Sequence, residues 1–184
     1  VKNSYHPGGT VTYIISIINS GTTPITGLTL TDDLGAYAFS TTSLTPLTYL
    51  DNTVKYYTNG TLQAAPAVTP GPPLVFSGLT VPANGNLTMV YETAANQYAP
   101  LTNESFIINT VTASGDGITS ITAKETVNAE ALPLLGITKS ISPVPVTENG
   151  SLTYTFLIQN EGNVPANEAT AVIVTDTFNP ILLI

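Results

Sequence analysis

The chain has 184 residues, no cysteine, and a formal net charge of -8 from 4 lysines and arginines against 12 aspartates and glutamates. So few basic residues argue against nucleic acid or an anionic membrane surface as a partner, because both attract proteins through basic patches. The lack of cysteine excludes disulfides and thiolate chemistry, and no apolar run approaches the ~20 residues of a membrane span, so we expect no membrane insertion.

The first strong pattern is an extended segment that occurs twice. Residues 9–21 have the sequence GTVTYIISIINSG, and residues 150–162 have the sequence GSLTYTFLIQNEG. Side chains alternate between the two faces of a strand. In the first copy this places four apolar side chains on one face: Val11, Tyr13, Ile15 and Ile17. The pattern predicts a half-buried strand in each copy and a tandem β-protein.

Further strand patterns follow at regular spacing. We expect strands over residues 25–31, 53–58, 61–65, 74–81, 87–93, 106–113 and 118–126. Asn59 and Gly60 predict a type I′ hairpin turn, because both central positions of that turn need positive φ. Residues 37–47 are compatible with strand or loop, and residues 66–73, with four prolines, predict a loop. Since no segment has helical periodicity, we predict an all-β immunoglobulin-like β-sandwich.

The repeat divides the chain. We expect a first β-sandwich unit over residues 1–129, a linker over 130–136, and a partial second copy over 137–184, with strands at 137–141, 152–160 and 171–175. Without a gap, Tyr13 aligns with Tyr154 and Asn19 with Asn160. Three extra residues then align Asp32 with Asp176. In this alignment the first unit lacks its opening strand and the second lacks its later strands, and incomplete sandwiches expose unpaired edges.

The motifs resemble those of the domain of unknown function 11 family, which are tandem repeats of bacterial surface proteins. The resemblance is carried by the paired Thr-Tyr…Asn-x-Gly strands and by residues 138–143 (TKSISP), 30–34 (LTDDL), 174–178 (VTDTF) and 109–112 (NTVT). It implies an immunoglobulin-like fold, export and a role in surface architecture, without enzymatic activity. The variant found here is similar to that of clostridia-like Gram-positive bacteria, some of whose proteins are subunits of spore or cell-surface appendages.

Surface modules of related architecture join a lysine to an asparagine in an isopeptide bond beside a buried acid. The positions here that match are Lys139 with Asp176 in the second unit, and Asp32 with Asn109 in the first. Burial favours the neutral amine and the protonated carboxyl that this reaction needs. Because neither unit holds all three groups, only a bond between subunits, from Lys139 to Asn109, is open. The favoured interpretation is a snorkelling lysine, a turn-capping aspartate and an asparagine at the end of a strand ladder.

Other candidate sites have simpler interpretations. Asp32 and Asp33 lack the alternating ligand loop of a calcium site, and His6 is expected to be a surface residue. Five tyrosines are candidates for a carbohydrate-binding face, but cross-strand packing is the favoured role: Tyr49, Tyr56, Tyr57, Tyr91 and Tyr98. We expect no catalytic residue, metal or cofactor.

The predicted function is therefore structural. We expect an exported, non-enzymatic protein of a cell or spore surface that builds a stalk, fibre or appendage by self-association with neighbouring copies. Strands from residues 137–141 or 179–184 would pair with the edge of the next subunit. The alternative is an adhesin module that binds a host protein or glycan.

Overall fold

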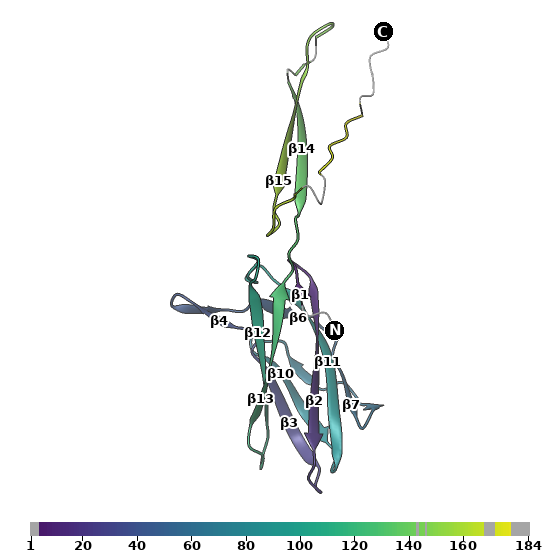
Figure 1. Cartoon of the computed structure of the whole chain (residues 1–184). Helices are drawn as coiled ribbons and strands as arrows, with labels where there is room; N and C mark the ends of the chain where they lie inside the picture. Colours follow the sequence, from purple (N-terminus) through teal and green to yellow (C-terminus); the bar gives the residue numbers. More distant parts are fainter. Residues whose placement is uncertain (1–3, 143, 146, 168–171, 178–184) are drawn as a thin grey trace. The chain divides into compact units, whose positions relative to one another are not determined.

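A computed structural model describes residues 4–142, 144–145, 147–167 and 172–177 (Figure 1). Every element of regular secondary structure in these residues is a β-strand, which confirms the all-β prediction. The described part of the chain accordingly has no helix long and apolar enough to cross a membrane. The chain forms two compact units, Val1–Glu130 and Ala131–Ile184.

The first unit is built from two main sheets. The six-stranded sheet has, in spatial order, β1 (Ser4–Tyr5), β13 (Ile121–Ala129), β12 (Phe106–Ser114), β3 (Ile25–Asp32), β10 (Leu74–Val81) and β9 (Ala67–Thr69). The five-stranded sheet has β2 (Thr10–Asn19), β11 (Gly85–Ala95), β7 (Lys55–Thr58) and β8 (Thr61–Leu62), with β6 (Leu47–Tyr49) also paired to β11. A separate hairpin joins β4 (Tyr37–Phe39) to β5 (Thr42–Leu44).

The core lies between the two sheets and follows the predicted alternation. In β2, the four inward positions are at most 9% exposed, and the positions between them are half-buried or exposed. Phe76 and Leu79 from β10 and Leu87 and Met89 from β11 are wholly buried. The core is therefore supplied by alternate residues of both sheets, as in a β-sandwich.

Most of the predicted strands are present, with corrections at the turns. Asn59 and Gly60 have φ of 49° and 79° between paired residues Thr58 and Thr61, which confirms the predicted hairpin turn. The predicted loop over 66–73 is wrong in part, because it contains β9, an edge strand with prolines on either side of it. Edge strands tolerate proline because one side of the strand needs no ladder hydrogen bonds.

The Asn-x-Gly motif that occurs in both copies has a structural reason in its asparagine. The Asn19 Oδ1 atom accepts a bond from the Gly21 N–H at 2.9 Å, and its Nδ2 donates to the carbonyls of Thr23 and Pro82 at 2.9 and 3.0 Å. Asn160 makes the same pair of turn bonds, from the Gly162 N–H and to the Val164 carbonyl. In each unit, the Asn-x-Gly motif therefore closes the turn after the repeated strand.

The second unit contains one antiparallel pair in its described residues. β14 (Leu135–Ser142) pairs with β15 (Thr153–Asn160) from Leu135↔Asn160 to Ser142↔Thr153. β14 begins two residues inside the segment expected as a linker. The strand predicted over 171–175 is wrong for residues 172–175, which are irregular. Residue 171 and the predicted donor segment 179–184 lie outside the described residues.

We predict that Asn19→Ala lowers the free energy of unfolding by roughly 1–3 kcal/mol, because it leaves the turn's backbone groups without partners. Asn86→Ala is the matched control, since Asn86 is exposed on the neighbouring strand β11, and we expect a change within about 0.5 kcal/mol. Chemical denaturation of both variants measures the difference. Equal effects would show that the Asn19 turn bonds do not stabilise the fold.

Candidate functional site

The most unusual polar residue of the first unit is Asp32, which ends the central strand β3 and is completely buried. β3 lies between β10 and β12, so Asp32 is flanked by strands on both sides. Its neighbours in the ladders are Leu74 and Val111. A carboxyl group at this position has no access to water and needs bonds from the protein itself.

Three donors supply those bonds, and they come from both sheets. The Tyr91 hydroxyl, on β11 of the opposite sheet, donates to Asp32 Oδ2. Asn109 Nδ2, on β12, donates to the same oxygen at 3.0 Å, and the Leu34 N–H donates to Oδ1 at 2.7 Å. We call Asp32, Tyr91 and Asn109 the carboxyl cluster. It links the two sheets through side chains.

The turn after β3 completes the cluster. Leu34 and Gly35 both have positive φ, of 54° and 71°, a conformation that glycine adopts at little cost. This turn directs the Gly35 N–H to Asn109 Oδ1 at 3.0 Å and to Asp33 Oδ1 at 2.9 Å. The same Asp33 oxygen accepts the Thr110 N–H at 2.9 Å. Asp33 therefore fixes the turn to β12, and the Asn109 amide is held at both of its ends.

Tyr13 of β2 lies beside the cluster. Its ring stacks on that of Tyr91, with centroids 5.6 Å apart and an interplanar angle of 24°. Its hydroxyl is buried and makes no hydrogen bond of ordinary geometry in the described residues, although the Asn109 side chain lies close enough to lower its pKa. Such a group carries a desolvation cost that no bond offsets. The Tyr13 hydroxyl, beside the cluster, is thus available for a further partner.

Burial sets the protonation of the cluster. Loss of water raises the pKa of Asp32, and the bonds from Tyr91, Leu34 and Asn109 oppose that rise without cancelling it. Burial also raises the pKa of Tyr91 and Tyr13, and the nearby charge of Asp32 raises both further. The Asp32 carboxyl is therefore more strongly held in its neutral form than the carboxyl of an exposed aspartate is.

The second unit holds the other two predicted residues together. Lys139 Nζ, on β14, donates to both carboxylate oxygens of Asp176, at 2.6 and 2.8 Å. The ammonium lies 4.4 Å from the centre of the Tyr154 ring and 5.5 Å from that of Phe156. The lysine side chain is 36% exposed and the aspartate side chain is 20% exposed. This is a partly solvated ion pair supported by cation–π contacts.

The structure corrects part of the favoured sequence interpretation. Asp32 caps a turn through Oδ1, as expected, but its second oxygen belongs to the buried cluster. Asn109 is not at the end of a strand ladder, because it lies inside β12 and is only 4% exposed. Sequence reasoning missed Tyr91 as a partner of Asp32. The one available signal was its pairing with Tyr13, which depends on the register of β11 against β2.

The five candidate tyrosines do not form a carbohydrate-binding face. Tyr49, Tyr56 and Tyr91 are buried, and Tyr98 is 43% exposed. The favoured packing role is confirmed for the buried three. Two of them contact Phe76, with ring centroids 5.9 Å away for Tyr49 and 5.1 Å away for Tyr91.

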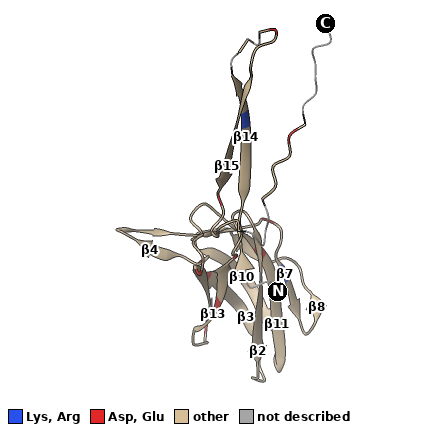
Figure 2. Ribbon diagram, turned by 45° about the horizontal axis from the view of Figure 1, so that its top comes forward, with Lys and Arg blue, Asp and Glu red and all other residues tan. Residues whose placement is uncertain are grey.

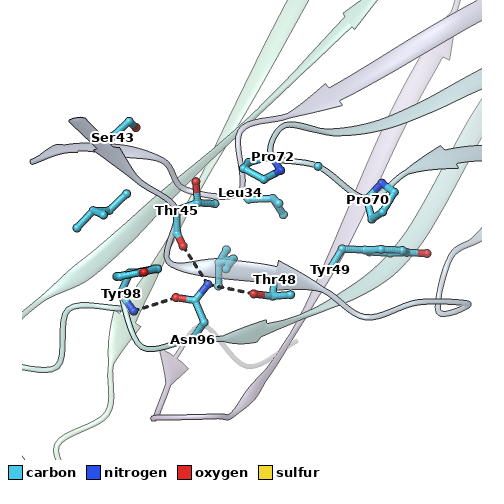
Figure 3. Close-up of a pocket in the computed structure, with 12 residues that line it drawn as sticks. Leu34, Ser43, Thr45, Thr48, Tyr49, Pro70, Pro72, Asn96 and Tyr98 are labelled. Atoms are coloured by element: carbon cyan, nitrogen blue, oxygen red, sulfur yellow. Dashed lines mark hydrogen bonds between the residues drawn. The ribbon is translucent and has the colours of Figure 1, made fainter. Parts of the chain in front are cut away.

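A cavity of about 430 Å³ lies between the segment 43–49 and the proline-rich turn at 70–72, with Leu34 and Tyr98 also in its lining (Figure 3). Its asparagine, Asn96, is fully engaged. Its Nδ2 donates to the Thr45 carbonyl at 2.9 Å and to Thr48 Oγ1 at 3.0 Å, and its Oδ1 accepts the Tyr98 N–H at 2.9 Å. The Asn96 amide therefore holds the loops around the cavity in place.

No group of three or more acidic or histidine side chains converges within the described residues in a way that suits a metal ion. His6 is exposed, and its Nδ1 lies 3.1 Å from the Pro7 carbonyl. The histidine is thus a surface residue, as expected.

Comparison with known proteins supports the fold. No family model matches the chain, and no curated protein matches it. Among solved structures, BcpA, the major pilin subunit of Bacillus cereus, is similar, with a TM-score of 0.52 and 8% identity over 86% of this chain and 52% of that chain. This chain thus spans about half the length of BcpA. The likeness agrees with the immunoglobulin-like β-sandwich predicted from the sequence.

Two further structures have lower TM-scores. The pilus backbone protein RrgB from Streptococcus pneumoniae has a TM-score of 0.42 and 19% identity, over 61% of this chain and 26% of that chain. A family 123 glycoside hydrolase from Clostridium perfringens has a TM-score of 0.43 and 10% identity, over 70% of this chain and 22% of that chain.

The two stacked tyrosines provide a matched pair of variants. We predict that Tyr91→Phe lowers the free energy of unfolding by roughly 1–3 kcal/mol, because Asp32 loses a buried donor. Tyr13→Phe removes a hydroxyl without a partner in the described residues, so we expect no loss of stability or a small gain. Urea denaturation at neutral pH compares the two. A loss for Tyr13→Phe as large as that for Tyr91→Phe would contradict the hydrogen-bond pattern of the cluster.

The raised pKa of Asp32 predicts a specific pH dependence. The folded state holds this proton more tightly than the unfolded state, so the stability that Asp32 contributes is lost as pH rises from the ordinary aspartate value through the raised pKa. The free energy of unfolding of the natural chain, minus that of Asp32→Asn, should therefore fall with pH in this window, by at most about 1.4 kcal/mol per pH unit. Asp116→Asn, at an exposed turn position, is the control and should show no such fall. A difference that rises with pH would mean that the carboxylate is favoured in the folded state.

Proposed function

We propose that this chain is a non-enzymatic structural module of a bacterial surface, which builds a fibre, stalk or appendage through strand contacts between copies. The observation that carries the proposal is the open edge of β2. This ten-residue strand pairs with β11 on one side and with no strand on the other among the described residues. Two large apolar side chains on its outer face, Ile14 and Ile18, are 55% and 79% exposed.

An edge of this kind favours association. A long edge strand presents a row of unpaired backbone donors and acceptors, and proteins usually block such edges with charge, proline or bulges. β2 contains no charged residue and no proline, so Figure 2 draws it in tan throughout. A strand from a neighbouring copy would satisfy these groups, and a head-to-tail contact repeated in this way produces a filament.

The sandwich fold is compatible with this role, because BcpA, which has a similar fold, is a pilin subunit. Surface or extracellular localisation belongs to the same proposal. The resemblance to the domain of unknown function 11 family, the clostridial type and the spore-surface location stay predictions.

We also propose that Lys139 of one copy and Asn109 of another are the residues of a covalent crosslink, with Asp32 as its acid. Lys139 Nζ, in its neutral form, would attack Cγ of Asn109. A new N–C bond forms, the bond from Cγ to Nδ2 breaks, and Nδ2 leaves as ammonia after a proton passes from the amine by way of Asp32. The contact between Asp32 and Asn109, at 3.0 Å, supports this assignment. Asp176 would release the lysine before the reaction, because the ion pair favours the charged amine.

Electron microscopy and sedimentation of the concentrated chain test the proposed function. We expect filaments or a concentration-dependent series of oligomers. A monomer at every concentration would contradict self-association, and saturable binding of that monomer on a glycan or matrix-protein array would favour the adhesin alternative.

The crosslink has a separate test on the same sample. We expect covalent multimers in boiled detergent, each lighter by one ammonia per bond in intact-mass spectra. Lys139→Arg keeps the positive charge but should abolish these multimers, whereas Lys124→Arg, on an exposed part of β13, should not. Fibres without the mass loss would refute the crosslink and leave the structural function intact.

A further inference from the structure

We propose that the open edge of β2 receives residues 135–142 of a second copy, in the register that β14 has with β15, and that Lys139 of that copy binds the carboxyl cluster. This inference rests on the proposed structural function and assigns its contact.

The acceptor edge lies on one side of the sandwich. β2 pairs with β11 at ten consecutive positions, from Thr10↔Ala94 to Asn19↔Gly85. β13, the last long strand of the other sheet, pairs with β12, and β1 covers only its final two residues, Asn128 and Ala129. Among the described residues, both sheets therefore end in open edges, and the longer open edge is that of β2.

The repeat shows which strand fits there. β15 is the counterpart of β2. The Glu161 N–H bonds to the Leu134 carbonyl beside β14, whereas the Gly9 and Gly21 carbonyls of the first unit accept bonds from the β11 side. Glu161 aligns with Ser20, and alternate residues of a strand bond to opposite edges, so β14 lies along the edge that stays open in β2. Lys139 pairs with Phe156 and Ile141 pairs with Tyr154. Since Tyr154 aligns with Tyr13, the same register on β2 places Lys139 opposite Ile15 and Ile141 opposite Tyr13.

This register places the apolar side chains of the donor segment, and Lys139, on the core face of the sheet. Residues directly opposite each other in an antiparallel pair lie on the same face of the sheet. Ile15 and Tyr13 face the core, so Lys139 and Ile141 would face it too, together with Ile137. The residues between them, Thr138 and Ser140, would face solvent. The donor segment thus has an apolar face with one lysine at its centre and a polar face.

The carboxyl cluster has the chemistry to bind that lysine. In the second unit, the Lys139 ammonium lies over the Tyr154 ring and bonds to Asp176. The counterparts in the first unit are Tyr13 and Asp32. The Tyr13 hydroxyl has no partner in the described residues, and Asp32 is bonded to neutral groups alone. An ammonium group would donate to Asp32 Oδ1, which takes one bond from the Leu34 N–H, and it would stabilise the ionised carboxyl. Transfer of one proton from that ammonium to Asp32 would then give the neutral amine and protonated carboxyl that the crosslink needs.

The donor strand is available for exchange. Every residue of β14 is exposed, because the described part of the second unit places no second layer on this hairpin. An isolated two-stranded hairpin is marginally stable in water, and a partly solvated ion pair such as Lys139–Asp176 contributes little. Moving β14 from β15 to β2 of another copy keeps an antiparallel ladder and adds burial of Ile137 and Ile141, which are 57% and 37% exposed in the hairpin.

A labelled peptide of residues 135–142 tests the proposal against the full chain, kept dilute so that the chain's own association is slight. We expect saturable binding, with new hydrogen-exchange protection confined to the amides of β2. The matched peptide with Lys139→Met keeps the length and the apolar face, and we expect its affinity to be at least about tenfold lower. Asp32→Asn in the chain should lower the affinity for the natural peptide by a similar factor and should change the affinity for the Lys139→Met peptide little. Asp116→Asn should lower the affinity for neither peptide.

Three results would overturn the proposal. They are no binding of the natural peptide, equal binding of both peptides to the natural chain, or protection on another edge such as β8, β9 or β13. The peptide comparison decides the question even if Asp32→Asn unfolds the chain. Fibres that form while the peptide fails to bind would refute this contact and not the structural function. Peptide binding to a chain that never self-associates would support the contact and refute the function.

Discussion

The burial of one carboxyl group between two sheets is the constraint on which the first unit depends. Asp32 loses its hydration completely, and the cost is offset by donors from β11, from β12 and from the turn that follows β3. Because those donors lie on different strands, the carboxyl fixes the distance and register between the sheets. The positive-φ turn at Leu34 and Gly35 supports the same arrangement. So do the two bonds that Asp33 Oδ1 accepts from the N–H groups of Gly35 and Thr110.

The two units carry complementary parts of one motif. The first unit brings an aspartate and an asparagine together in a dry interior, and the second brings a lysine and an aspartate together at a partly solvated surface. The repeated strand is paired on its outer side in the second unit and open on that side in the first. This asymmetry is the physical basis for proposing that one copy supplies a strand and a cation to the next.

Local rules were sufficient for much of the fold. The alternation of Val11, Tyr13, Ile15 and Ile17 predicted the buried face of β2, and Asn59 and Gly60 predicted a turn whose dihedral angles the structure confirms. The pairing of Asp32 with Asn109 and of Lys139 with Asp176 followed from family-like motifs. The partnership of Tyr91 with Asp32 was not predictable, because it depends on the packing of one sheet on the other. β9 was missed because proline content says nothing about whether a segment lies at a sheet edge.

The most direct test of this account is the titration of the Asp32 carboxyl carbon by nuclear magnetic resonance, in the full chain with and without the peptide of residues 135–142. The account predicts that the pKa of Asp32 lies above the ordinary aspartate value in the free chain and falls when the peptide binds, because an ammonium group stabilises the carboxylate. The peptide with Lys139→Met should leave the pKa raised. An Asp32 pKa at or below the ordinary value in the free chain, or one that the lysine-containing peptide does not lower on binding, would contradict the central claim.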